Sequence, residues 1–113
     1  MKIAIIGSRN IKNIKIENYI SNNCSEIVSG GAIGVDTCAA DYARKNSIKL
    51  TVFKPEYRKY GKAATIVRNK QIVEYSDKII AFWNGSSKGT LSVIKHCKAL
   101  GKPCEIIIQP HST

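Results

Sequence analysis

Short apolar runs alternate along the chain with segments in which apolar residues recur every three or four positions. Five of the runs are β-branched and nearly continuous: residues 3–6, 26–28, 50–53, 79–83 and 105–108. Runs of this kind are typical of strands that are buried on both faces of a parallel sheet. The apolar spacing between the runs predicts four helices, around residues 16–24, 35–43, 66–73 and 91–99.

This alternation of strands and helices predicts the fold class. Consecutive parallel strands are joined by right-handed crossovers, which place helices on both faces of the sheet. We therefore expect an α/β, Rossmann-like, three-layer doubly wound parallel sheet of about five strands in the order 3-2-1-4-5. The chain has 113 residues, enough for a single core, so residues 1–113 are predicted to form one domain.

Local signals mark where some of these elements end. Asn46 is predicted to close the second helix, and Gly101, with Pro103 just beyond it, to close the fourth. Residues 54–63 show no apolar periodicity and are predicted to form a long loop, rich in basic residues, before a third helix that begins near Arg68.

Two glycine-rich turns each follow a predicted strand and precede a predicted helix. They are residues 29–36 and residues 84–90. A turn of this kind presents free backbone N–H groups and the positive end of a helix dipole, so it favours an anion. Because strand-to-helix loops of such a sheet meet at one edge, both turns and the loop after the first strand are expected to line one crevice. The residues predicted to bind ligand there are Gly7, Ser8, Arg9, Ser29, Gly30, Gly31, Gly34, Asp36, Arg68, Asn69, Trp83, Gly85, Ser86, Lys88, Gly89 and Thr90.

Several of these side chains have two interpretations. Asp36 either caps the second helix or holds a ribose hydroxyl, and Ser86, Ser87 or Thr90 either cap the fourth helix or donate to phosphate. Trp83 either stacks on a base or fills the core. Asn69 bonds either a loop carbonyl or the ligand, and Arg9 is either a surface cation or a ligand contact.

Charge favours a phosphorylated or polyanionic partner. Lysine and arginine number 18 against 8 acidic residues, a formal net charge of +10. This balance does not distinguish a nucleotide from a nucleic acid. Lys88 is the most informative cation, because a positive side chain at a helix N-terminus is unfavourable unless an anion is bound there.

Other function classes find little support in the sequence. The four cysteines form no CxxC pair, and neither histidine has triad-like neighbours, so we expect no metal, no bound cofactor and no catalytic triad. No apolar stretch approaches the roughly 20 residues of a membrane span, and the first apolar run is too short for a signal peptide, so the expected location is the cytoplasm. The chain also lacks GxGxxG after its first strand and GxxxxGK[ST] anywhere.

Taken together, ordered motifs across nearly the whole chain resemble the YspA/YpsA-related branch of the SLOG superfamily. The segments that carry the resemblance are residues 7–9, 29–36, 60–64, 68–69, 76–77 and 80–90. The resemblance implies a Rossmann-like domain whose ligands are nucleotides or their derivatives. The superfamily includes the lonely-guy phosphoribohydrolases and the DNA-processing protein of transformation.

The resemblance to the phosphoribohydrolases is incomplete. Arg68 matches the arginine of their third helix, but Val93 stands where their PGGxGTxxE motif has its glutamate. Valine cannot act as an acid or base or stabilise an oxocarbenium-like sugar. Whether the chain is an enzyme is therefore left open.

The expected function is binding of a nucleotide or nucleotide-derived phosphorylated ligand at the C-terminal edge of the sheet, in order to sense, carry or sequester it. One alternative is a hydrolase that cleaves the N-glycosidic bond of a nucleoside monophosphate. The other is a single-stranded DNA-binding module, which ranks third because aromatic stacking platforms are few. Self-association into a homo-oligomer is expected from the resemblance.

Overall fold

A parallel sheet organises the protein, whose computed structural model describes residues 1–11, 13–31 and 34–108. The strands are β1 (Lys2–Gly7), β2 (Glu26–Ser29), β3 (Lys49–Val52), β4 (Lys78–Trp83) and β5 (Cys104–Ile108). Their order, β3-β2-β1-β4-β5, confirms the predicted topology. β1 and β4 lie side by side at the centre, with Ile5 opposite Ile80, and all four strand pairs are parallel. The reversal of strand order therefore falls between β1 and β4, where such folds bind ligands.

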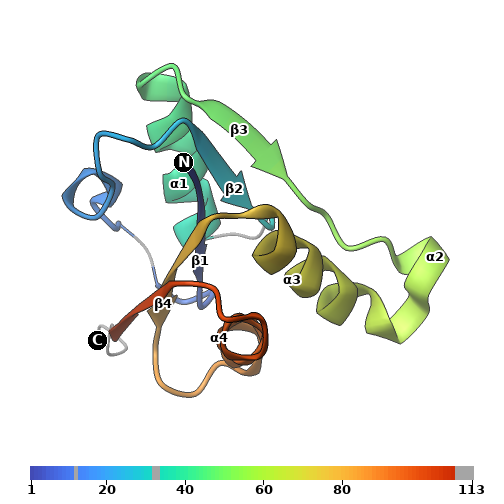
Figure 1. The fold of residues 1–113 in the computed structure, drawn as a ribbon. Coiled ribbons are helices and arrows are strands. Elements are labelled where there is room, and N and C mark those ends of the chain that lie inside the picture. The colour runs from blue at the N-terminus through green and yellow to red at the C-terminus, as the bar shows by residue number, and fades with distance from the viewer. Residues whose placement is uncertain (12, 32–33, 109–113) are drawn as a thin grey trace.

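Helices cover both faces of this sheet (Figure 1). They are α1 (Val35–Lys45), α2 (Tyr57–Tyr60), α3 (Ala64–Tyr75), α4 (Lys88–Leu100) and the 3-10 helices η1 (Ile16–Asn18) and η2 (Gly61–Ala63). One buried cluster joins α1 to the sheet through residues such as Val35 and Ala39. A second cluster joins α3 and α4 to the other face through Ile72 and Val93. The three layers predicted from the sequence are confirmed.

Both predicted helix ends are confirmed. Asn46 follows α1, and its backbone N–H and its side-chain amide donate to the carbonyl of Tyr42 at 3.1 and 2.9 Å. Gly101 follows α4 in the left-handed conformation, with φ of 66°, and its N–H donates back to the last turn of the helix.

The helix predicted around residues 16–24 was wrong. Only η1, a single short 3-10 turn, forms between β1 and β2. The apolar positions still pack inward: Ile16 is buried, and the Tyr19 ring meets Phe82 edge-on with centroids 5.0 Å apart. The polar run that follows, Ser21-Asn22-Asn23, explains the difference, because such side chains compete for backbone hydrogen bonds.

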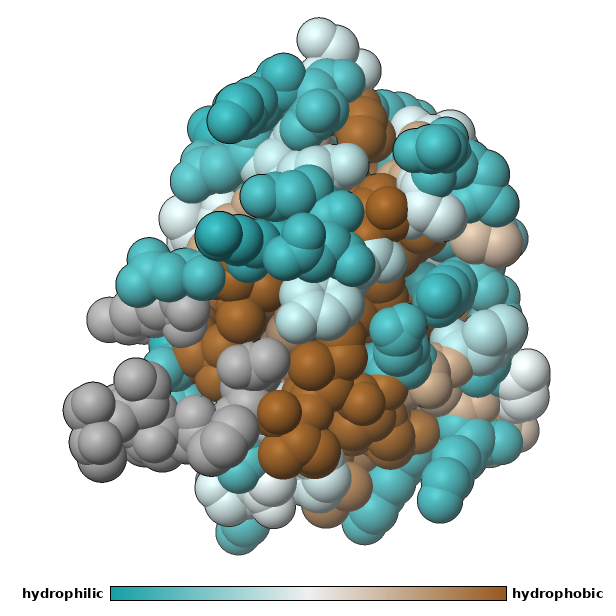
Figure 2. All heavy atoms as spheres, turned by 90° about the vertical axis from the view of Figure 1, so that its left-hand side faces the viewer, coloured by the Kyte–Doolittle hydropathy of each residue, from teal (hydrophilic) through white to brown (hydrophobic). Residues whose placement is uncertain are grey.

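This short connection leaves part of the α1 side of the sheet less covered. Figure 2 looks onto that side of the molecule and shows apolar surface between polar groups. Partly buried residues that pack against the core cluster of this face include Ile14, Ile20 and Ile107. The missing helix therefore exposes apolar area that a fully wound sheet would cover.

The segment predicted to be a long loop is partly helical, which corrects the prediction for residues 54–63. The amides of Lys59 and Tyr60 donate to the carbonyl of Glu56 at 3.1 and 3.0 Å and form the single turn of α2. α3 then begins at Ala64, one turn earlier than predicted. The arm formed by α2 and η2 extends from the body of the molecule (Figure 1). Neither helix has a buried residue, so local hydrogen bonds and not an apolar face stabilise them.

Within the described residues, the longest helix is α4 with 13 residues. No helix there combines the length and the apolar character needed to cross a bilayer.

Candidate functional site

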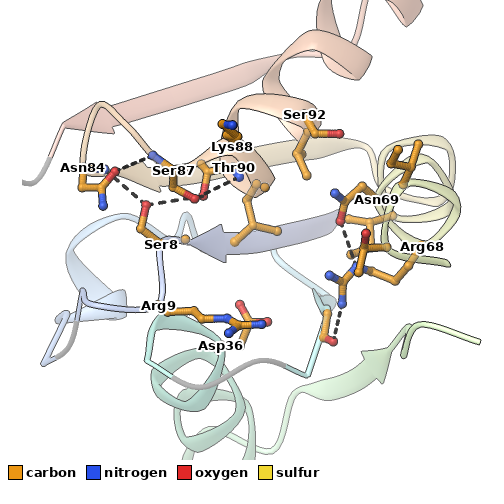
Figure 3. A pocket seen from close by; sticks show the side chains of 18 of the residues that line it. Ser8, Arg9, Asp36, Arg68, Asn69, Asn84, Ser87, Lys88, Thr90 and Ser92 are labelled. Carbon is orange, nitrogen blue, oxygen red and sulfur yellow. Dashed lines mark hydrogen bonds between the residues drawn. The ribbon is translucent and has the colours of Figure 1, made fainter. Parts of the chain in front are cut away.

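A cavity of about 710 Å³ opens at the carboxyl edge of the sheet. The loop after β1, the start of α1, one face of α3 and the first turns of α4 surround it (Figure 3). The residues that line it are Ile6, Gly7, Ser8, Arg9, Asn10, Gly30, Asp36, Thr65, Ile66, Arg68, Asn69, Ile72, Asn84, Ser87, Lys88, Gly89, Thr90, Ser92 and Val93. The crevice therefore brings together the loop after β1, part of the first glycine turn and the entrance of α4.

The turn that leads into α4 is organised by one amide side chain. Asn84 Oδ1 accepts hydrogen bonds from the backbone N–H groups of Ser86 and Ser87 at 2.9 and 2.8 Å. Ser87 is the N-cap, and its Oγ accepts from the Thr90 N–H at 3.4 Å. Three of the amides that we expected to hold phosphate thus already have acceptors inside the turn.

Two other amides remain at this helix terminus. Lys88 and Gly89 are the first two residues of α4, so their N–H groups have no acceptor within the helix. They also find none elsewhere in the part of the chain that the structure describes. Both residues line the cavity, so the positive end of the helix dipole faces it.

Hydroxyl groups lie beside these amides. Ser8 is buried, and its Oγ accepts from the Asn84 N–H at 3.3 Å and lies 3.5 Å from Thr90 Oγ1. Ser87 Oγ in turn donates to Thr90 Oγ1 at 3.3 Å. These contacts hold the loop after β1 against the first turn of α4, as Figure 3 shows.

Lys88 brings a positive charge to the same end of the cavity. Its side chain is exposed, and it forms no ion pair with any residue in the described ranges. An ammonium group beside a helix N-terminus is repelled by the dipole. The position therefore favours an anion that both could bind.

Arg68 occupies the other end, on α3. Its Nη1 donates to the carbonyl of Gly30 at 2.8 Å, and its Nε donates to Asn69 Oδ1 at 2.8 Å. Burial lowers the pKa of Arg68, and the nearby Asp36 carboxylate opposes that shift. A guanidinium remains charged despite such a shift, so Arg68 is a fixed cation in the cavity wall.

Gly30 allows this approach because it has no side chain. A Cβ at this position would lie 2.8 Å from Arg68 Nη1 and 3.4 Å from Asp36 Oδ2. The glycine predicted to contact phosphate through its amide thus also makes room for the Arg68 guanidinium and the nearby Asp36 carboxylate.

Asn69 and Asp36 support this arrangement. Asn69 is 7 % exposed, and its amide oxygen orients the Arg68 side chain, a partner that neither of our two interpretations named. Asp36 is buried in the first turn of α1, beside Arg68. Figure 3 shows Arg9 reaching from the loop after β1 toward Asp36.

Six predicted site residues lie outside the cavity lining: Ser29, Gly31, Gly34, Trp83, Gly85 and Ser86. Trp83 donates its indole N–H to the carbonyl of Ser87 at 3.0 Å and packs against the core, which fits the core interpretation. Gly31 donates its N–H to Ser29 Oγ at 3.1 Å. These residues shape the turns around the cavity. Residues 32–33 of the first glycine turn lie outside the described residues.

Part of the cavity lining was not predicted from the sequence. Thr65, Ile66 and Ile72 lie on the same face of α3 as Arg68 and Asn69, and helical spacing around Arg68 identifies them. Asn84 directly follows a strand and precedes two serines, which is typical of a side chain that folds back onto backbone amides. Both signals were present in the sequence.

The walls of the cavity carry three cations, Arg9, Arg68 and Lys88, and one carboxylate, Asp36. Its polar end lies at the N-terminus of α4, and apolar side chains of Ile66 and Ile72 on α3 and of Val93 on α4 line another part of it. The arrangement suits a molecule with an anionic end and a flatter, less polar body.

Comparison with protein-family models found no match, and a search of curated proteins found no relative of this chain.

Proposed function

We propose that the protein binds a nucleotide or nucleotide-derived molecule in this cavity, with a phosphate at the N-terminus of α4. The observation that carries the proposal is the pair of unpartnered amides at Lys88 and Gly89, beside an unpaired ammonium group. Backbone N–H groups, a helix dipole and a cation together form the common protein environment for phosphate.

The rest of the cavity supports a nucleoside body on that phosphate. A volume of about 710 Å³ lies within the usual range of small-molecule sites. Arg68 and Asp36 offer a donor and an acceptor for a sugar or base, and Ile66 and Ile72 offer an apolar wall. Binding for sensing, transport or sequestration needs no further chemistry.

The resemblance of the sequence motifs to the SLOG superfamily supports this proposal, and Val93 favours binding over turnover. Val93 is 3 % exposed and lines the cavity at the position where the phosphoribohydrolases carry glutamate. A buried isopropyl group there can transfer no proton.

Replacing Lys88 by alanine tests the phosphate end. We expect affinity for a nucleoside monophosphate to fall at least tenfold, because a charge-assisted hydrogen bond contributes about 1.5–3 kcal/mol. Isothermal titration calorimetry with a panel of purine and pyrimidine nucleoside monophosphates measures this loss. Affinity for the corresponding nucleosides, which lack phosphate, is expected to stay unchanged.

The matched control is Lys95→Ala. Lys95 lies two turns further along α4, is exposed and does not line the cavity. The substitution removes the same charge from the same helix and is expected to leave the affinity for the nucleoside monophosphate unchanged. If both substitutions lowered the affinity equally, only the net charge of the protein would matter. If Lys88→Ala left the affinity unchanged, the proposal that phosphate binds at the N-terminus of α4 would be wrong.

Cleavage of the N-glycosidic bond is the second candidate function. Asp36 favours it, because this carboxylate is buried on the cavity wall beside Arg68, where it could stabilise positive charge on a sugar. Chromatography that measures the free base released from nucleoside monophosphates incubated with the protein tests this function. Release that Asp36→Asn abolishes supports a hydrolase, whereas binding without release by the unmodified protein supports a carrier or sensor.

A further inference from the structure

Oxygen atoms in the turn before α4 are turned toward donors of the protein itself. Asn84 Oδ1 accepts from the N–H groups of Ser86 and Ser87 and, at 3.2 Å, from the Ser86 hydroxyl. The carbonyl of Ser87 accepts from the N–H of Leu91 at 3.2 Å and from the indole N–H of Trp83 at 3.0 Å. Both oxygens are therefore already engaged before any ligand binds.

The loop after β1 uses its oxygen atoms in the same way. Asn10 Oδ1 accepts from the side-chain amide of Asn84 at 3.1 Å, and the carbonyl of Ser8 accepts from the N–H of Ile11 at 3.1 Å. Ser8 Oγ accepts from the backbone N–H of Asn84 at 3.3 Å. Asp36 is the one carboxylate in the described part of the cavity lining, and it lies on α1, away from this turn (Figure 3).

Donors at the same place lack acceptors. The backbone N–H groups of Lys88 and Gly89 have none in the described ranges, and the Lys88 ammonium group forms no ion pair there. Both residues line the cavity. The N-terminus of α4 therefore offers hydrogen-bond donors to a ligand.

A pair of buried hydroxyl groups adds a further donor. Ser8 and Thr90 line the cavity, are 2 % and 5 % exposed, and place their hydroxyl oxygens 3.5 Å apart (Figure 3). Either hydroxyl can donate to the other, but only one of them at a time. Thr90 Oγ1 also accepts from the Ser87 hydroxyl at 3.3 Å. One proton of the pair is therefore left without an acceptor among the residues that the structure describes, which is costly until a bound group supplies one.

A set of donors of this kind distinguishes the charge states of a phosphate. A phosphate monoester in its dianionic form has three terminal oxygens that only accept hydrogen bonds. The monoanion carries a proton on one of these oxygens, and that proton needs an acceptor of its own. A phosphodiester carries one charge and has two terminal oxygens, so it leaves donors of the site without a partner.

We propose that the N-terminus of α4 selects the dianionic form of a terminal phosphate monoester, and that Ser8 and Thr90 determine this specificity. The inference rests on the proposed binding of a nucleotide in this cavity and narrows its ligand class. The ligand is a nucleoside with a free terminal phosphate, whereas a phosphate that links two nucleosides, as in a dinucleotide or a nucleic-acid chain, is disfavoured.

The pH dependence of binding tests the inference on the unmodified protein. Adenosine, guanosine, cytidine and uridine 5′-monophosphates are titrated by calorimetry at pH 5, 6, 7 and 8. The second pKa of a phosphate monoester is about 6, so roughly one molecule in eleven is dianionic at pH 5 and nearly all are at pH 8. Affinity for the monophosphate that binds most tightly at pH 8 is expected to be about tenfold lower at pH 5.

Two analogues of that nucleotide separate its own titration from that of the protein. The nucleoside 5′-sulfate has three terminal oxygens and one charge, and the 5′-(methyl phosphate) has two terminal oxygens and one charge; neither gains a proton between pH 5 and pH 8. We expect the affinity of both to be constant over this range. The methyl ester is expected to bind at least tenfold more weakly than the monophosphate at pH 8, because it loses a charge-assisted hydrogen bond.

The sulfate also reports on the charged side chains of the cavity. These are Lys88 on α4, Arg68 on α3, Arg9 after β1 and Asp36 on α1. A change in the ionisation of any of them would alter binding of the sulfate as well. Constant affinity for the sulfate thus assigns the pH dependence to the phosphate.

Substitution of Lys88 locates the selective site. Lys88→Glu adds a carboxylate that repels the dianion but can accept the proton of the monoanion, so the difference in affinity between pH 8 and pH 5 is expected to disappear. The matched control is Lys88→Gln, which removes the charge without adding a carboxylate. It is expected to weaken binding at both pH values and to keep the preference for pH 8.

The outcomes separate this inference from the proposed function. If none of the four monophosphates binds at any pH, nucleotide binding in this cavity is wrong and the inference fails with it. Four results overturn the inference alone and leave nucleotide binding in place: a monophosphate affinity that does not change with pH, a sulfate affinity that changes in parallel, a methyl ester that binds as tightly as the monophosphate at pH 8, and a pH dependence that Lys88→Glu leaves intact.

Discussion

Replacing Gly34 by alanine is expected to lower the free energy of unfolding by about 3 kcal/mol. Gly34 precedes α1 with φ of 82°, a conformation that L side chains rarely adopt. A Cβ there would lie 2.7 Å from the carbonyl oxygen of Ile11 and 2.9 Å from that of Arg9. Both obstacles are backbone atoms, so strain and overlap add. The shift of the urea unfolding midpoint measures the loss.

Gly89→Ala is the control for this substitution. Gly89 also lies at the start of a helix, but an added Cβ would meet no heavy atom within 4 Å and its φ is ordinary. Alanine there is expected to leave stability unchanged or raise it slightly. If the two alanine variants unfold at the same urea concentration, a side chain at position 34 does not clash with the loop after β1, and the prediction is wrong.

Replacing Glu26 by alanine is expected to cost a similar amount, about 3 kcal/mol. Glu26 is 7 % exposed on β2, and its Oε2 accepts hydrogen bonds from the hydroxyls of Thr51, at 2.6 Å, and Tyr75. Lys49 Nζ lies 3.7 Å from Oε1. Alanine leaves both hydroxyls without this acceptor and removes a buried charge that three neighbours stabilise. Chemical denaturation at pH 7 measures the difference.

Acid should reduce this difference between the two proteins. The hydrogen bond from Thr51, then that from Tyr75, lowers the pKa of Glu26 below its ordinary value of 4.5. A lowered pKa means that the contribution is complete above pH 4.5 and is lost as the pH falls through the value of the folded state. The difference between the unfolding free energies of Glu26→Ala and the unmodified protein is therefore expected to shrink as the pH falls through that value.

Tyr75→Phe separates this carboxylate from other acid-sensitive groups. It removes one of the two hydroxyl donors and keeps Glu26, so a smaller loss with the same pH dependence is expected. Asp77, whose pKa is also lowered by a backbone hydrogen bond from Lys2, remains in all variants and cancels from the comparison. A difference between Glu26→Ala and the unmodified protein that stays constant down to acid pH would contradict the assignment.

The sheet could be predicted because its signal is local and strong. Each strand is a short β-branched run, and the alternation with helical patterns leaves few topologies. The helix around residues 16–24 failed for the opposite reason: Ile16, Tyr19 and Ile20 have helical spacing, yet they bury their side chains from a mostly irregular connection. Apolar periodicity records which residues turn inward and does not fix the backbone between them.

The candidate site followed from topology, but its contacts did not. Parallel strands bring their carboxyl ends to one edge, which placed Ser8, Gly30, Arg68 and Lys88 around one cavity. Which amides are already hydrogen bonded depends on how Asn84 folds back, and no spacing rule determines that. The expected self-association stays a prediction.

The Glu26 cluster also escaped our sequence analysis, although a signal was present. A carboxylate opens the β-branched run of β2, and Lys49 lies directly opposite it in β3. One strand begins with a negative residue and its neighbour with a positive one, and this arrangement predicts an ion pair at that edge of the sheet. The contribution of Tyr75 could not be foreseen, because it comes from the far end of α3.

Glu26 and Lys49 are the first residues of β2 and β3, whereas the cavity lies at the edge where the strands end. The polar contacts that secure the chain and those that would recognise a small molecule thus involve different residues. Such a division lets descendants of this sequence, or a protein engineer, exchange the cavity walls for new specificities while the anchoring residues keep the scaffold folded.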